Sequence, residues 1–113
     1  MLKHHPDVIY LDSAHEVEET LIEVKLAYSV LKPYGILFGD DWAWDGVRHD
    51  VVNFVRELKP PPRRAVELRE SFLRASGSVG LNCTTPELNR PFQASTLTLC
   101  EPGGTWVLFK GLD

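Results

Sequence analysis

The stretch that decides the fold runs from Asp7-Val-Ile-Tyr-Leu-Asp12 to Ile36-Leu-Phe-Gly-Asp-Asp41. Its two ends are short, continuous apolar runs bounded by polar residues, without the in-and-out alternation of a half-exposed strand. Runs of this kind indicate strands that are buried on both faces, as in a parallel sheet. We therefore predict two parallel strands here.

The residues between these strands predict an amphipathic helix. Ser13 followed by Glu16 is a capping-box pattern, which places the start of the helix near His15. The segment Lys32-Pro-Tyr-Gly35 ends the helix with a breaker and a glycine turn. Apolar residues recur between these limits at steps of four and three, on one helix face: Val17, Leu21, Val24, Tyr28 and Leu31.

A second helix is expected after the second strand, with Asp45 as its N-cap. Prolines at positions 60–62 end it. Residues 7–58 therefore give the order strand, helix, strand, helix, which predicts an α/β fold with right-handed crossovers. The apolar positions that keep the helical spacing are Val47, Val51, Phe54, Val55 and Leu58.

The remainder of the chain is less regular until its end. Residues 65–73 are compatible with a helix or with a strand and loop, and residues 77–92 are expected to be irregular. Residues 95–110 predict a terminal β-hairpin around the turn Glu101-Pro-Gly-Gly104. The spacing of Cys83 and Cys100 fits no zinc or redox motif, so we expect ordinary core or loop thiols.

The composition describes one soluble globular domain. The chain has 113 residues, of which 43% are hydrophobic and 25% charged, and its net charge is -4. No basic patch is dense enough to indicate nucleic-acid binding. The apolar stretches are far shorter than the ~20 residues that span a bilayer, so no membrane partner is expected. With no signal peptide at the N-terminus, we expect a cytoplasmic protein.

Acidic side chains follow both predicted strands. Asp12 closes the first strand, and Asp40 and Asp41 close the second. Because ligands of open parallel sheets bind at the carboxyl ends of the strands, these acids indicate a site. Oxygen ligands of this type favour Mg²⁺ or another hard divalent cation. The alternative is that the three acids cap helices and face solvent.

Three further residues could complete this site. His15 lies in the first turn of the predicted helix and could act as a general base near neutral pH. Trp42 and Trp44 could wall a substrate pocket. The alternatives are a surface histidine, and indole rings that pack the loop onto the sheet.

Residues 7–15, the turn at 31–35, the strand 36–41 and the segment 46–54 together resemble the second half of class I S-adenosylmethionine-dependent methyltransferases. The resemblance is closest to the metal-dependent O-methyltransferases of the catechol and macrocin type. It implies a Rossmann-like, three-layer α/β/α fold with a partial doubly wound sheet that ends in an antiparallel hairpin. Residues 1–113 would then be a single partial methyltransferase domain.

The resemblance also implies the roles of the site residues. S-adenosylmethionine would contact Leu11, Asp12, Ser13 and Ala14. Mg²⁺ would be held by Asp12, Asp40 and Asp41 and would chelate the hydroxyl of a small-molecule acceptor. His15 falls where the catechol enzymes place a catalytic lysine, and it would take the proton.

The chain departs from the class in two respects: no G-x-G-x-x-G loop follows a strand, and the acid that ends the second strand of the class and holds the cofactor ribose is absent. We therefore expect a C-terminal half that needs the other half for activity. A half sheet would expose a strand edge, so low stability and self-association are expected. Two alternatives stay open: a metal-dependent hydrolase or sugar-transferring enzyme that uses the acids, and a non-catalytic domain.

Overall fold

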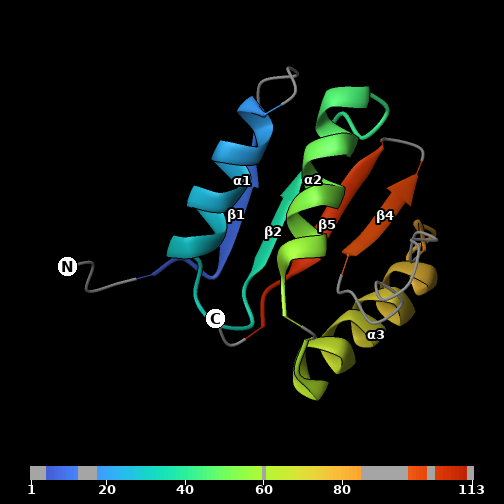
Figure 1. Cartoon of the computed structure of the whole chain (residues 1–113). Helices are drawn as coiled ribbons and strands as arrows, with labels where there is room; N and C mark the ends of the chain where they lie inside the picture. The colour runs from blue at the N-terminus through green and yellow to red at the C-terminus, as the bar shows by residue number, and fades with distance from the viewer. Residues whose placement is uncertain (1–4, 13–17, 60, 85–96, 102–103, 112–113) are drawn as a thin grey trace.

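The computed structural model describes residues 5–12, 18–59, 61–84, 97–101 and 104–111. Within these ranges the chain forms a compact α/β domain with a five-stranded mixed sheet and three helices (Figure 1). The elements are β1 (Val8–Leu11), α1 (Glu19–Val30), β2 (Ile36–Gly39), α2 (Asp45–Glu57), α3 (Arg63–Ser78), β3 (Asn82–Thr84), β4 (Leu97–Glu101) and β5 (Thr105–Phe109).

The strand order in the sheet is β1-β2-β5-β4-β3. Strands β1 and β2 are parallel, as predicted, with Val8 opposite Ile36. The expectation that both are buried on both faces is wrong for β1, where Val8 is 53% and Tyr10 48% exposed, because β1 has a neighbouring strand on one side only among the described residues. The predicted hairpin is also confirmed, because β4 and β5 pair antiparallel. The last strand does not extend the sheet at an edge: β5 lies between β4 and β2 and is antiparallel to both.

The two faces of the sheet are covered differently. Helices α1 and α2 lie side by side over one face (Figure 1), where Leu37, Trp106 and Leu108 join their apolar side chains in one buried cluster. Successive side chains of a strand point to opposite faces, so Phe109 points away from this cluster. Its ring contacts that of Phe72 on α3, with centroids 5.6 Å apart. Helix α3 therefore packs on the opposite face, next to β5 and β3.

Three local predictions differ from the structure. Helix α1 begins at Glu19 and not near His15, and residues 13–17, which carry the predicted capping box, lie outside the described residues. Asp45 is the first residue of α2 and not its N-cap, a position that Trp44 occupies. For residues 65–73 the helix alternative is confirmed, since they lie within α3. Part of the segment expected to be irregular, residues 82–84, is a strand because it pairs with β4.

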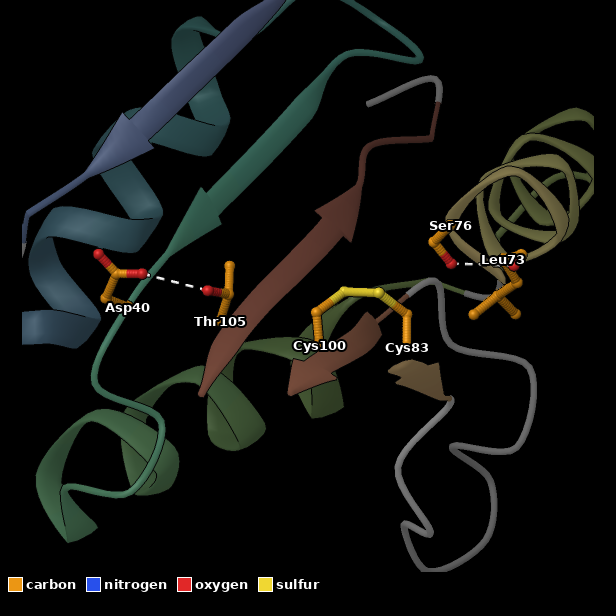
Figure 2. The surroundings of a disulfide bond; sticks show 6 residues. All are labelled: Asp40, Leu73, Ser76, Cys83, Cys100 and Thr105. Atoms are coloured by element: carbon orange, nitrogen blue, oxygen red, sulfur yellow. Dashed lines mark hydrogen bonds between the residues drawn. A yellow bond between two sulfur atoms is a disulfide. The ribbon is translucent and has the colours of Figure 1, made fainter. Parts of the chain in front are cut away.

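Cys83 and Cys100 form a disulfide (Figure 2), so the expectation of ordinary thiols is wrong. The two residues are directly opposite each other in the β3–β4 pair. Cross-strand neighbours bring their Cβ atoms within reach of a covalent bond. Their separation of 17 residues in the sequence gives no sign of this proximity.

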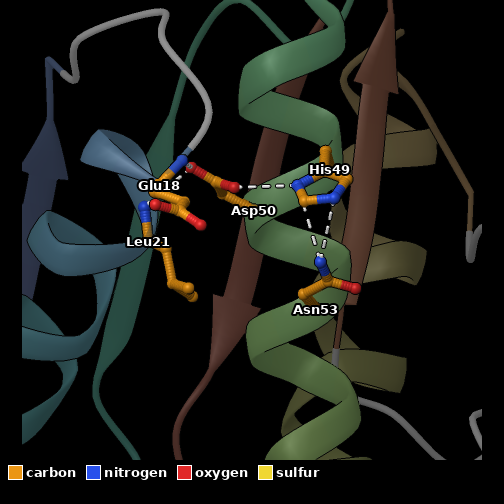
Figure 3. Close-up of polar contacts among 5 residues, drawn as sticks. All are labelled: Glu18, Leu21, His49, Asp50 and Asn53. Carbon is orange, nitrogen blue, oxygen red and sulfur yellow. Dashed lines mark hydrogen bonds and ion pairs between the residues drawn. The ribbon is translucent and has the colours of Figure 1, made fainter.

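Helix α1 receives its N-terminal cap from helix α2. The carboxylate of Asp50 is fully buried, and its Oδ2 accepts hydrogen bonds from the backbone N–H groups of Glu18 (2.6 Å) and Leu21 (3.0 Å) (Figure 3). Its Oδ1 lies 2.9 Å from Nδ1 of His49. A carboxylate at this position satisfies N–H groups that have no partner within the helix, and it is favoured by the helix dipole.

The other end of α1 is capped from the last strand. Nζ of Lys110 donates hydrogen bonds to the carbonyl oxygens of Tyr28 (2.7 Å) and Leu31 (2.6 Å). Lys110 is only 5% exposed, and its Nζ lies 5.0 Å from the centroid of the Tyr28 ring. The C-terminal carbonyl groups of the helix therefore face a buried cation, as the helix dipole favours.

Substitution of Asp50 should destabilise the fold. We expect Asp50→Ala to lower the free energy of unfolding by about 2 kcal/mol, because it leaves two N–H groups without an acceptor. Asp50→Asn should cost less, since the amide oxygen can still accept. Urea denaturation followed by circular dichroism measures both. The control is His49→Ala, which removes a half-exposed neighbour, and the capping role is contradicted if this variant is equally destabilised.

Loss of the disulfide should also destabilise the fold. A double variant, Cys83→Ser with Cys100→Ser, should lose about 3 kcal/mol of unfolding free energy, because closing a loop of this length restricts the unfolded chain. A reductant should shift the denaturation midpoint of the wild-type protein and leave that of the double variant unchanged. Two titratable thiols in the non-reduced native protein would show that the bond does not form.

Candidate functional site

The paired ends of β1 and β2 carry the predicted acids. Leu11 is opposite Gly39 in the parallel register, so Asp12 and Asp40 each follow one of two adjacent strand ends. Both are exposed, whereas Asp41 is partly buried and has a positive φ of 65°. The chain therefore turns sharply directly after β2. The three acids lie together beyond the carboxyl ends of β1 and β2.

Gly39 allows the strands to approach closely at this edge. A Cβ on Gly39 would lie 2.7 Å from Cζ2 of Trp106 and 2.8 Å from the carbonyl oxygen of Leu11. The indole ring of Trp106 is fully buried and occupies the space that a side chain would need. The glycine before the two aspartates is thus required by the packing of β5 against β2.

Asp40 connects three strands through its carboxylate. The hydroxyl of Tyr10 on β1 donates a hydrogen bond of 2.7 Å to Oδ2. The hydroxyl of Thr105 on β5 donates one of 3.2 Å to Oδ1 (Figure 2). The Tyr10 ring also packs on that of Phe38, with centroids 5.2 Å apart. Asp40 is consequently held in one orientation from both neighbouring strands.

The three acids act together on the hydroxyl of Tyr10. The hydrogen bond to Asp40 raises the pKa of Tyr10 to about 12, and the negative charges of Asp40, Asp12 and Asp41 contribute in the same direction. Tyr10 is therefore protonated at neutral pH and serves as a hydrogen-bond donor. Burial of the hydroxyl also raises this pKa.

The acids do not enclose a ready-made metal position. Among the residues that the structure describes, no group of three or more His, Cys, Asp or Glu side chains is arranged to hold a metal ion. The carboxylates of Asp12, Asp40 and Asp41 have the oxygen chemistry that suits Mg²⁺, but their side chains would have to converge further. The predicted Mg²⁺ site stays a prediction.

The other predicted site residues have different surroundings. Leu11 is partly buried and packs against the core cluster, and His15, Ser13 and Ala14 lie outside the described residues. Trp42 packs against the same cluster, and its backbone N–H donates to the carbonyl of Gly104 (3.0 Å).

Trp44 is 53% exposed at the start of α2. The two tryptophans are therefore not equivalent, since one anchors the loop and the other faces solvent. Trp42 fits the alternative in which an indole ring packs the loop onto the sheet. The role of both rings in a substrate pocket stays a prediction.

Sequence reasoning missed two residues of this site, Tyr10 and Thr105. Tyr10 lies two residues before the strand-ending Asp12, and its ring reaches across to the adjacent strand. The sequence does carry a signal for Tyr10, because this residue lies in the predicted strand that ends in Asp12. Thr105 carries no comparable signal, because its proximity to Asp40 depends on the insertion of β5 beside β2.

Comparison of the chain with protein-family models, curated proteins and solved structures returned no match. None of the helices in the described ranges is long and apolar enough to cross a membrane.

The titration of Tyr10 tests this arrangement of charges. Its pKa is raised from 10.0 to about 12, so its contribution to stability is complete below pH 10 and is lost as the pH rises through 12. The difference in absorbance at 295 nm between the wild-type protein and Tyr10→Phe should rise near pH 12. The same difference measured in an Asp40→Asn background should rise nearer pH 10. Circular dichroism must show a folded protein throughout, and a midpoint unaffected by Asp40→Asn would contradict the hydrogen bond.

Proposed function

We propose that this chain is part of a class I, Rossmann-like methyltransferase that transfers a methyl group from S-adenosylmethionine to a hydroxyl of a small molecule with the help of a divalent metal. The observation that carries the proposal is the arrangement at one end of the sheet. Two parallel strands, β1 and β2, end side by side in acids, and the last strand, β5, runs antiparallel beside β2. This arrangement agrees with the resemblance of residues 7–54.

The carboxyl ends of β1 and β2 offer a position for the cofactor and the acceptor. In open α/β sheets, ligands bind beyond the carboxyl ends of the parallel strands. Residues 11–14 follow β1 at this edge and would contact S-adenosylmethionine, while Asp40 and Asp41 follow β2. The negative charges of Asp12, Asp40 and Asp41, which follow the two strands here, would favour a bound cation at the same place.

The residues of the chain would divide the work as follows. Asp12, Asp40 and Asp41 would supply the oxygen ligands of Mg²⁺, and the metal would lower the pKa of an acceptor hydroxyl. Tyr10 and Thr105 hold the Asp40 carboxylate in place, and Tyr10 is a positioning residue because it keeps its own proton at neutral pH. His15 stays the proposed base, and the main contribution of the site would be to align the acceptor oxygen with the methyl group.

We also propose that the chain associates with itself through the β1 edge of the sheet. β1 pairs only with β2 within the described residues, and unpaired strand edges favour addition of another strand. Next to this edge Val8 is 53% exposed and Tyr10 48% exposed. An interface here would cover apolar surface as well as backbone groups.

Calorimetric titration of S-adenosylmethionine, with and without Mg²⁺, tests the methyltransferase proposal. We expect cofactor binding that Mg²⁺ strengthens by about tenfold, the usual size of coupling between two ligands. Asp40→Asn should abolish the Mg²⁺ effect because it removes a charged ligand. The control is Glu57→Gln, which neutralises an exposed acid on α2 and should change nothing.

The outcomes of this titration separate the function classes. Mg²⁺ binding that Asp40→Asn abolishes, without any cofactor binding, would contradict a working cofactor site in this chain and would favour a hydrolase or a sugar-transferring enzyme. Binding of neither ligand would favour a non-catalytic domain.

A further inference from the structure

The face of the sheet opposite α1 and α2 contains a cavity of about 410 Å³. Ile36, Phe38 and Val107 line it from β2 and β5, and Phe72 lines it from α3. Leu81, which follows α3, contributes another wall. The volume lies in the range of small-molecule sites.

This cavity exists because both faces of the central strands are apolar but only one is fully covered. Leu37 points into the α1–α2 cluster, while Ile36 and Phe38, its neighbours on β2, point to the other face. Helix α3 covers that face next to β5 and β3. Towards β1 the surface opens to solvent, and Val8, another lining residue, is 53% exposed. Apolar surface in contact with water favours an apolar ligand by about 25 cal/mol per Å² covered.

The polar groups of the cavity select the charge of the ligand. Its only ionisable lining residue among those described is the acidic Glu101. Thr105 also lines the cavity, and its hydroxyl donates to the carboxylate of Asp40, so a second acid lies just beyond this wall. No Lys, Arg or His lines the cavity in the described part of the chain. An anionic ligand would therefore meet like charge, whereas a cationic group would be attracted.

We propose that this cavity binds a small apolar amine, with its hydrocarbon part against Ile36, Phe38 and Phe72 and its ammonium group towards Glu101. The site adjoins the strand-end acids, since Thr105 lines it and also holds Asp40, but its apolar walls lie on the face of the sheet and not at the ends of β1 and β2. It holds whether or not the chain is a methyltransferase.

Calorimetry with three ligands of the same chain length tests the proposal: decylamine, decanol and decanoate, each below its micelle concentration. We expect one decylamine per chain, decanol bound more weakly, and decanoate weakest. Glu101→Gln should weaken decylamine binding by about threefold to fivefold, the range for a solvent-exposed ion pair. It should leave decanol binding unchanged, which distinguishes loss of the charge from damage to the cavity.

Two charge insertions locate the site. Val8→Lys adds a cation at the exposed wall of the cavity and should reverse the preference towards decanoate. The matched control is Ile22→Lys on α1, which replaces another exposed apolar residue, 68% accessible, on the helix that covers the other face. It should leave the order of affinities unchanged.

Three results would overturn the proposal. The first is equal affinity for the three ligands, and the second is an equal effect of Val8→Lys and Ile22→Lys. The third is decylamine binding that does not saturate at one molecule per chain, since adsorption to apolar surface in general, and not one site, would then explain the heat.

Discussion

Opposite charges at the two ends of helix α1 are the interaction on which the rest of the structure depends. The anion, Asp50, comes from the middle of α2, and the cation, Lys110, comes from the residue after β5. Each neutralises one pole of the helix dipole in a buried position, where charge interactions are strong. The same two contacts fix α1 against α2 and against the last strand, so the helix ends determine how the layers fit together.

The order of the strands, with β5 beside β2, creates the site. With α1 and α2 held over β1, β2 and β5, the ring of Trp106 packs against Gly39, and β5 comes close enough for Thr105 to reach Asp40. The strand-end acid is thus oriented by a residue from the far end of the sequence. The packing of Trp106 against Gly39 on one face of the sheet therefore helps to orient the Asp40 carboxylate at the end of β2.

The sequence predicts the parts of this structure that rest on local patterns. The apolar runs and helical spacing of residues 7–58 identify two strands and two helices, and the strand-ending acids identify the candidate site. Asp50 is not recognisable in the same way, because it lies within a regular helix and its partners are the distant N–H groups of Glu18 and Leu21. Thr105 joins the site only through strand pairing, which leaves no mark in the local sequence. The pairing of Cys83 with Cys100 has the same cause, since β3 is a strand only because β4 lies beside it.

The disulfide between β3 and β4 links the outer part of the sheet to the redox potential around the protein. In an oxidising compartment the bond persists, and the three-residue strand β3 is covalently attached to its neighbour. In a reducing compartment the same strand is held by its backbone hydrogen bonds to β4 and its contacts with α3. Because Cys100 also lines the cavity beneath α3, the disulfide ties one wall of that cavity to β3, and this tie depends on the redox conditions around the protein.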